Sequence, residues 1–276
     1  MCGIVAFKGN KEKTSEVIFE GLKLLEYRGY DSCGIGVIDN KEIKTFKWKG
    51  RVRNTEKRFI ESKIKSPIAI GHTRWATHGE PNDVNSHPIT SFNKKFAIVH
   101  NGIIENYREL KKILLEKGYE FYTETDTEVL VNFIELCVSN AKNIDKGISY
   151  ALSKLEGAFG IVLIQRSNTD IMYAARKGSP LAFGRKGENF FIASDATPII
   201  EYTKKIIYLD NGQLLKIDKS SFEVLDFDLN KVPKKFQEVD VELQRVELGD
   251  FDSYMLKEIM EQPESVSYTH LRAHET

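Results

Sequence analysis

The amino-acid sequence predicts a protein of the α+β class, in which antiparallel strands and helices form separate layers. Apolar runs of strand length follow one another across short polar or glycine-containing turns, as they do in antiparallel hairpins. The segments with helical periodicity group in the middle of the chain and do not alternate with the strands. This arrangement favours a layered α+β fold over a doubly wound parallel sheet.

Four segments are predicted to be helical because apolar residues recur in them at helical spacing. They are residues 16–26, residues 106–118, a segment that starts at residue 125, and residues 144–155. Asn106 is a suitable N-cap, Thr125 and Glu128 form a capping box, and Gly157 is predicted to stop the last helix.

The predicted strands are short runs rich in β-branched and aromatic residues. They are residues 4–7, 32–38, 68–73, 96–100, 159–164, 171–174, 190–193, 206–208 and 214–217.

Composition narrows the class of protein before any motif is considered. The chain has 276 residues and balances 40 Lys and Arg against 40 Asp and Glu, so no overall charge favours nucleic acid or an anionic membrane. No apolar stretch approaches the ~20 residues that span a bilayer, and the N-terminal run lacks the basic region of a signal peptide. The three cysteines, Cys2, Cys33 and Cys137, argue against a disulfide framework. We therefore expect a cytoplasmic protein without nucleic-acid or membrane partners.

The C-terminal part differs in character from the rest. Residues 1–227 are predicted to form the main domain, and the chain becomes polar and poor in strands from about residue 228. Within residues 228–264, residues 251–264 suggest the start of a further helical region. Residues 265–276 do not continue that periodicity and read as a non-native tail, so they are excluded from the fold prediction.

Cys2 is the first residue with reactive chemistry. If Met1 is removed, one residue carries both a thiol and the chain's α-amine, whose ordinary pKa of about 7.7–8.0 leaves part of it neutral at pH 7. A thiol beside such a base has what a nucleophile requires. The alternative is that Cys2 is a small apolar residue at the start of a strand.

Asn101 and Gly102 follow His100 at the end of an apolar strand. An Asn amide and a Gly backbone N–H at such a place could form an oxyanion hole. An Asn-Gly pair also commonly forms a tight turn, and from the pair alone that alternative remains open.

The string from His72 to Gly79 holds the densest group of functional side chains. Its Arg74 is suited to binding a carboxylate through two hydrogen bonds. A metal site is the alternative, since His72, His78, His87 and His100 are available, but their spacing matches no zinc motif. A serine hydrolase has no more support, because the chain lacks a Gly-x-Ser-x-Gly elbow.

Asp126 lies in the first turn of its predicted helix. An acid in that turn complements the helix dipole. The same carboxylate could instead face the ammonium group of an amino-acid ligand, and both interpretations stay open.

Read together, these strings resemble a known family. They occur in the order found in class II glutamine amidotransferases, which are N-terminal-nucleophile hydrolases, and within these the sequence is most similar to the glutaminase domain of the glucosamine-6-phosphate synthases. The resemblance covers the chain up to about residue 264. The strings are Cys2-Gly3-Ile4-Val5, Tyr27-Arg28-Gly29-Tyr30-Asp31-Ser32, residues 72–80, residues 100–106, Glu124-Thr125-Asp126-Thr127-Glu128, residues 156–160 and Ala193-Ser194-Asp195.

The resemblance implies a catalytic role for several residues. Cys2 would be the nucleophile after loss of Met1, with its own amine as general base, and Asn101 and Gly102 would form the oxyanion hole. Arg28 would support the nucleophile, and Trp75 would be a mobile residue that gates the passage of ammonia.

The resemblance also implies a glutamine site and an architecture. Arg74, with Thr77 and His78 nearby, would bind the α-carboxylate of L-glutamine, and Asp126 would bind its α-amine. The family fold is a four-layer αββα sandwich with two antiparallel sheets, and the chemistry needs no cofactor and no metal.

The family's sugar-isomerase region is expected to be missing. Full-length members use the ammonia to convert fructose 6-phosphate to glucosamine 6-phosphate in that region and are expected to be homodimers, whereas residues 228–264 match only its entry. The rival hypotheses are another class II amidotransferase, such as amidophosphoribosyltransferase or asparagine synthetase, and a regulatory domain that binds glutamine without turnover.

Overall fold

The computed structural model describes residues 2–61, 64–75 and 79–239, together with single residues near the C-terminus. The chain divides into two compact units, Met1–Asp240 and Val241–Thr276. In the second unit, Leu256, Ile259, Met260, Gln262 and Pro263 have helical backbone. Residues 265–276 lie outside the described residues, so the assignment of residues 228–264 and 265–276 stays a prediction. Among the described residues, no helix is both long enough and apolar enough to cross a membrane.

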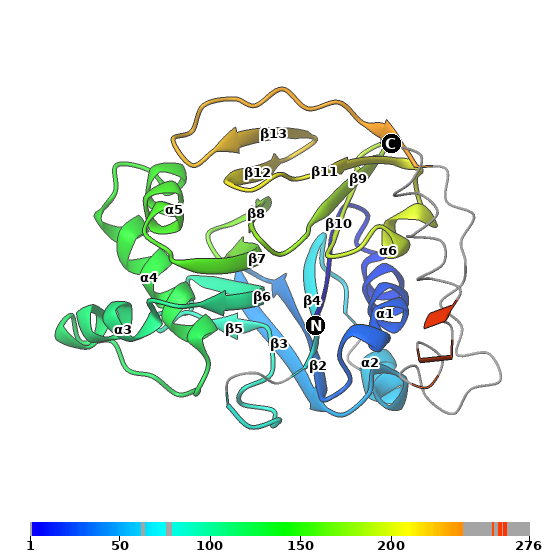
Figure 1. Ribbon diagram of the computed structural model, residues 1–276, viewed down its shortest axis with the longest axis horizontal. Helices are drawn as coiled ribbons and strands as arrows, with labels where there is room; N and C mark the ends of the chain where they lie inside the picture. The colour runs from blue at the N-terminus through cyan, green and yellow to red at the C-terminus, as the bar shows by residue number, and fades with distance from the viewer. Residues whose placement is uncertain are drawn as a thin grey trace. The chain divides into compact units, whose positions relative to one another are not determined.

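Two antiparallel sheets form the centre of the first unit (Figure 1). The described strands of the larger sheet follow the spatial order β14 (Gln237–Glu238), β11 (Lys205–Tyr208), β9 (Ala182–Lys186), β10 (Asn189–Ala193), β1 (Gly3–Lys8), β4 (Ile68–Arg74), β2 (Ser32–Asp39) and β3 (Glu42–Lys49). Those of the smaller sheet follow the order β13 (Ser221–Asp226), β12 (Gln213–Asp218), β8 (Asn168–Lys177), β7 (Gly157–Gln165), β6 (Phe96–Ile104) and β5 (Ile89–Thr90).

Alternation along the central strands explains how the two sheets stack. In β1, Ile4 and Ala6 belong to an apolar cluster that also holds residues of the smaller sheet, such as Val99 of β6. The intervening Val5 and Phe7 belong to a second cluster on the opposite face. Because successive side chains of a strand point to opposite faces, β1 is buried on both sides, and its whole length is apolar except for Lys8.

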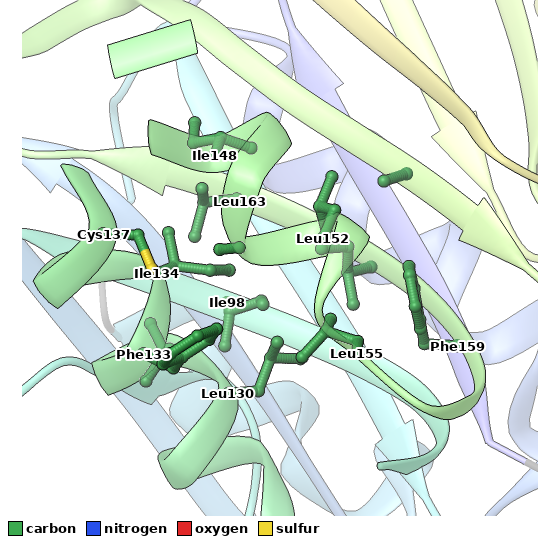
Figure 2. Close-up of a cluster of buried hydrophobic side chains, with 14 of the residues drawn as sticks. Ile98, Leu130, Phe133, Ile134, Cys137, Ile148, Leu152, Leu155, Phe159 and Leu163 are labelled. Atoms are coloured by element: carbon green, nitrogen blue, oxygen red, sulfur yellow. The ribbon is translucent and has the colours of Figure 1, made fainter. Parts of the chain in front are cut away.

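Helices cover the outer face of each sheet (Figure 1). The larger sheet packs against α1 (Thr14–Leu24) and α6 (Thr197–Ile200), with α2 (Glu56–Glu61) nearby. The smaller sheet packs against α4 (Asp126–Asn140) and α5 (Ile144–Ser153), with α3 (Tyr107–Glu116) beside α4. Figure 2 shows this last cluster, in which α4 and α5 place their apolar side chains over the strands of the smaller sheet. The layers are therefore α, β, β and α, and the predicted α+β sandwich is confirmed.

The capping box predicted at the start of α4 is present only in part. Thr125 caps α4, since its hydroxyl accepts a hydrogen bond from Glu128 N at 3.2 Å, as the capping box predicts. The Glu128 carboxylate, however, accepts from the backbone N–H groups of Tyr122 and Thr123 and thus fastens the preceding turn.

Two further predicted helix ends differ from the structure in part. Asn106 is the N-cap residue of α3, as predicted, but its side chain makes no capping bond; it donates to Lys154 O at 2.9 Å and accepts from Glu156 N at 3.2 Å. Gly157 does not stop α5, which ends at Ser153. It opens β7 with a positive φ of 102°, where a Cβ would lie 2.3 Å from Ile103 O.

Candidate active site

A cavity of about 360 Å³ lies where the first residue before β1, the end of β4, strand β6 and the start of α4 come together. Thr77 and His78 fall outside the described residues. The described residues that line the cavity are Cys2, Arg28, Arg74, Trp75, His87, His100, Asn101, Gly102, Ile103, Thr125, Asp126, Thr127, Ser179 and Pro180. All the other predicted site residues are in this set, although they are far apart in the sequence.

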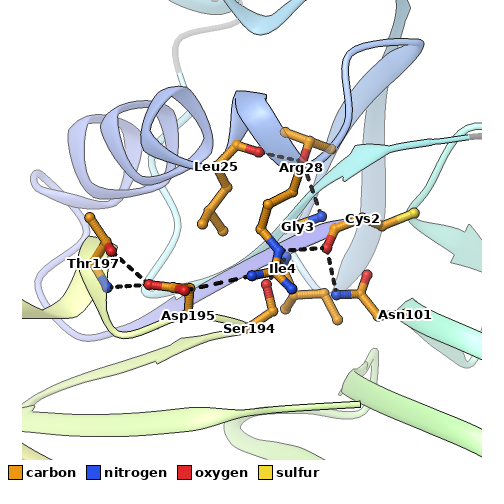
Figure 3. Close-up of polar contacts among 10 residues, drawn as sticks. Cys2, Gly3, Ile4, Leu25, Arg28, Asn101, Ser194, Asp195 and Thr197 are labelled. Atoms are coloured by element: carbon orange, nitrogen blue, oxygen red, sulfur yellow. Dashed lines mark hydrogen bonds and ion pairs between the residues drawn. The ribbon is translucent and has the colours of Figure 1, made fainter. Parts of the chain in front are cut away.

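Cys2 is fixed at the edge of the cavity by hydrogen bonds to both its thiol and its backbone. The backbone N–H of Trp75 donates to Cys2 Sγ at 3.2 Å. The Cys2 carbonyl oxygen accepts from Asn101 Nδ2 at 2.9 Å and from Arg28 Nε at 3.3 Å (Figure 3). Burial raises the pKa of the Cys2 thiol, and the opposing effects of the Trp75 N–H and the Arg74 charge do not cancel that rise. The thiol is therefore protonated near neutral pH and needs a base to become a nucleophile.

The segment after Cys2 is held by the strands on either side of β1. Gly3 N donates to the hydroxyl of Thr73 on β4 at 3.1 Å, and Ile4 N donates to the hydroxyl of Ser194 after β10 at 3.0 Å. A Cβ on Gly3 would lie 2.6 Å from Thr73 Oγ1. Because residue 3 is glycine, the backbone at the N-terminal end of β1 can lie close to β4, and Cys2 reaches the cavity.

Asn101 and Gly102 do not form the tight turn that their sequence allows. They continue β6, where they pair with Gly160 and Phe159 of β7. Gly102 has a φ of 121°, and a Cβ there would lie 2.0 Å from Ala158 O, so only glycine fits without strain. The strand thus carries the Asn101 amide and the Gly102 backbone to the cavity wall.

Arg74 ends β4 and is 3% exposed. Its guanidinium donates to the carbonyl oxygens of Glu80 at 3.2 Å and Gly79 at 3.1 Å, which orient it beside the cavity. Burial lowers the pKa of Arg74, while the neighbouring Cys2 and Asp126, among others, raise it. An arginine remains charged under such conditions, so the cavity has a fixed positive group in one wall.

Asp126 is the first residue of α4 and is 5% exposed. Its Oδ2 accepts from Ile104 N at 2.9 Å, which ties the helix start to the end of β6. The carboxylate complements the helix dipole and also lines the cavity, so the two interpretations of this residue are compatible.

Arg28 and Trp75 both contact Cys2. Arg28 Nη1 lies 3.6 Å from Asp195 Oδ2, and Asp195 accepts from the backbone and hydroxyl of Thr197 at 2.9 and 2.6 Å (Figure 3). The indole of Trp75 is 40% exposed and meets the ring of Tyr30 edge-on, with 5.4 Å between ring centroids.

A cluster of buried histidines, two of which line the cavity, was not predicted as part of the site. His87 Nε2 and His100 Nδ1 each lie 2.9 Å from the hydroxyl of Thr127, and the rings of His72 and His87 are 4.4 Å apart. Burial lowers the pKa of His72 to about 3 and that of His87 well below its usual range. From the sequence, these histidines were considered as metal ligands. Within the described part of the chain, no group of three or more His, Cys, Asp or Glu side chains could hold a metal ion.

Comparison with protein families and curated proteins finds similarity to proteins that use glutamine. A family model described as a glutamine amidotransferase domain matches residues 72–201. The glutamine–fructose-6-phosphate aminotransferase [isomerizing] of Bacteroides thetaiotaomicron is 44% identical over 269 residues, which are 96% of this chain and 44% of that protein. The protein of the same name from Chlorobaculum tepidum is 43% identical, with the same coverage. The chain thus spans less than half the length of the curated relatives it matches.

Solved structures share the fold. The glutamine phosphoribosylpyrophosphate amidotransferase of Bacillus subtilis superposes with a TM-score of 0.71 at 28% identity, over 83% of this chain and 50% of that one. A glutamine aminotransferase class-II domain protein from Silicibacter pomeroyi has a TM-score of 0.57 at 14% identity, over 82% of this chain and 99% of that one.

Proposed function

Since the chain belongs to the glutamine amidotransferases, we propose that it hydrolyses L-glutamine to glutamate and ammonia, with Cys2 as the nucleophile. One observation carries the proposal. Cys2, Asn101, Gly102, Arg74 and Asp126 line the same cavity of about 360 Å³, and this volume suits a small amino-acid ligand.

The charged ends of glutamine match two walls of this cavity. Arg74 would bind the α-carboxylate through its guanidinium, and Asp126 would bind the α-ammonium group. Thr77 and His78 are proposed to assist at the carboxylate. With both ends held, the side-chain amide would extend toward Cys2, which is the orientation that converts binding energy into a reactive geometry.

The first half of the reaction forms a thioester. The α-amine of Cys2, exposed by loss of Met1, would take the thiol proton as Sγ attacks the side-chain amide carbon of glutamine. The developing oxyanion would accept hydrogen bonds from Asn101 Nδ2 and from the backbone N–H of Gly102. The carbon–nitrogen bond then breaks, and the protonated amine returns its proton to the departing ammonia.

The second half regenerates the enzyme. The same amine would take a proton from water, whose oxygen attacks the γ-glutamyl thioester; glutamate leaves and the thiol recovers its proton. An internal base is needed because burial raises the pKa of the Cys2 thiol. Arg28 would keep the Cys2 backbone in place, and Trp75, half-exposed next to the thiol, would gate the exit of ammonia.

The use of the ammonia is a separate proposal that concerns a longer protein. The relatives of which this chain covers 44% carry the name glutamine–fructose-6-phosphate aminotransferase. We propose that this chain is the ammonia-producing part of such an enzyme, which would form glucosamine 6-phosphate from fructose 6-phosphate and act as a homodimer. The cytoplasm is the proposed location.

The test is glutamate release from glutamine by the purified chain, beside Cys2→Ala, with the intact mass of each protein recorded. Turnover that vanishes in Cys2→Ala, from a chain that has lost Met1, is expected. Full activity in a chain that retains Met1 would overturn the role of the amine. Glutamine binding without turnover, after confirmed loss of Met1, would favour a regulatory glutamine-binding domain instead.

A further inference from the structure

We propose that His72 is a positioning residue that holds the side-chain amide of Asn101 in the one orientation that directs its N–H groups toward Cys2. The expected effect on reaction rate rests on the proposed glutaminase reaction. The orientation of the Asn101 amide rests only on the geometry of the buried side chains.

The carbonyl group of His100 determines which nitrogen of His72 carries the proton. His72 is fully buried, and its Nε2 lies 3.0 Å from His100 O and 3.0 Å from Asn101 Oδ1. A backbone carbonyl oxygen can only accept a hydrogen bond, so Nε2 must be the protonated nitrogen. The ring is neutral, because burial and the nearby Arg74 hold the pKa of His72 at about 3. Its single ring proton is therefore on Nε2.

The protonated Nε2 then selects the orientation of the Asn101 amide. An amide presents an acceptor oxygen at one end and an NH₂ donor at the other. Only the oxygen can face the Nε2–H of His72, so the NH₂ group faces the opposite way. There it donates to Cys2 O at 2.9 Å, as the nitrogen end of Asn101 does in Figure 3. A flipped amide would set N–H against N–H at His72 and oxygen against oxygen at Cys2.

The orientation bears directly on the reaction. The Asn101 NH₂ group has two N–H bonds, one of which the Cys2 carbonyl occupies, and the other can donate to the oxyanion. Without the contact to His72, the amide could turn its oxygen toward the developing negative charge. Binding of glutamine would change little, since its charged ends are assigned to Arg74 and Asp126. The loss should therefore appear in kcat and leave KM nearly unchanged.

The experiment compares His72→Leu, which has no donor, with His72→Gln, whose amide can donate near the position of Nε2. We expect kcat for glutamate release to fall about 10- to 100-fold in His72→Leu and less than about fivefold in His72→Gln, with KM within about threefold of the wild type in both. In an Asn101→Ala background, His72→Leu should cost less than about threefold more, because the group that it orients is gone. A full, independent loss in that background would overturn the proposal, and so would equal losses in the two single variants.

A measurement on the unsubstituted chain tests the orientation without relying on folding of a variant or on turnover. The ¹⁵N shifts of the His72 ring should report a neutral ring protonated at Nε2. A ring protonated at Nδ1 would overturn the proposal. Failure of the glutaminase assay in the wild type would instead contradict the proposed function, and the ring measurement would still decide whether His72 orients Asn101.

Discussion

Replacing Gly102 by alanine tests whether β6, which carries the proposed oxyanion-hole residues Asn101 and Gly102, must have its observed backbone. Gly102 has a φ of 121°, and an added Cβ would lie 2.0 Å from Ala158 O on the paired strand. The backbone conformation alone costs a non-glycine residue about 1–3 kcal/mol. Forcing a methyl group into a packed site costs about 1–3 kcal/mol more. We expect Gly102→Ala to lower the free energy of unfolding by about 2–6 kcal/mol.

Gly50→Ala is the matched control for this change. Gly50 has a φ of 104°, but an added Cβ there meets nothing within 4 Å. Gly50→Ala should lower the free energy of unfolding only by the conformational cost, about 1–3 kcal/mol. The difference between the two variants therefore gives the cost of the contact between the added Cβ at residue 102 and Ala158 O. Urea titration monitored by circular dichroism gives both values. Equal losses, or a Gly102→Ala variant as stable as the wild type, would show that contact between an added Cβ and Ala158 O does not destabilise the fold.

Four further outcomes are expected. Asp126→Asn should raise KM for glutamine about 10- to 100-fold while the folded chain remains as stable as the wild type within about 1 kcal/mol, since a charge-assisted hydrogen bond to the substrate is lost. Arg74→Lys should raise KM by a similar factor, because a lysine cannot bind a carboxylate through two parallel hydrogen bonds. The plot of kcat/KM against pH should rise through the ordinary pKa of an α-amine, about 7.7–8.0, and then level off, because the Cys2 amine acts as a base only when neutral. Below pH 6.5, the free energy of unfolding should fall as pH falls, and His72→Gln should reduce that slope by up to about 1.4 kcal/mol per pH unit.

The sign of the last effect follows from the depressed pKa. Folded His72 has a pKa of about 3, whereas an unfolded histidine has one of about 6.5. Between those two pH values the unfolded chain binds one more proton at this histidine than the folded chain does. The stabilising contribution of neutral His72 is therefore complete above pH 6.5 and is lost progressively below it. Denaturant titrations between pH 5.0 and 7.0 measure the slope. An unchanged slope in His72→Gln would contradict the depressed pKa of His72. Unchanged KM values in Asp126→Asn and Arg74→Lys would contradict their proposed roles in binding glutamine. A flat pH–rate profile would contradict the proposed role of the Cys2 amine as a base.

The interior of the fold was more predictable than its edges. The apolar pattern of β1 and the helical spacing of α4 were read from the sequence because every residue of β1 and most residues of α4 are buried. The edge strand β3 was missed, since lysines interrupt its apolar residues and only Trp48 is buried. The interior strand β9 was missed because Gly184 stands in its centre, where Ile199 of α6 approaches within 2.4 Å of the place of a Cβ.

Reactive residues could be recognised locally, but their assembly required the topology. Nothing in local sequence brings Cys2 beside Asn101. The stacking of the two sheets does so, together with the hydrogen bonds that Gly3 N and Ile4 N donate to the hydroxyls of Thr73 and Ser194. The Asn-Gly pair suggested a turn because its usual conformations favour one. Pairing with β7 overrode that preference, and the Asn101 side chain found partners in the opposite sheet.

The proposed role of Cys2 as the nucleophile can be tested by reaction with an electrophilic analogue of glutamine, followed by intact-mass and peptide mass spectrometry. We expect one label per chain, located on Cys2 and blocked by excess glutamine. Cys33 and Cys137 should stay unmodified, because they are 2% and 8% exposed and burial raises their thiol pKa values to about 12 and about 11. Labelling of Cys33 or Cys137 with loss of activity, or complete labelling of Cys2 with turnover intact, would contradict the proposed role of Cys2 as the nucleophile.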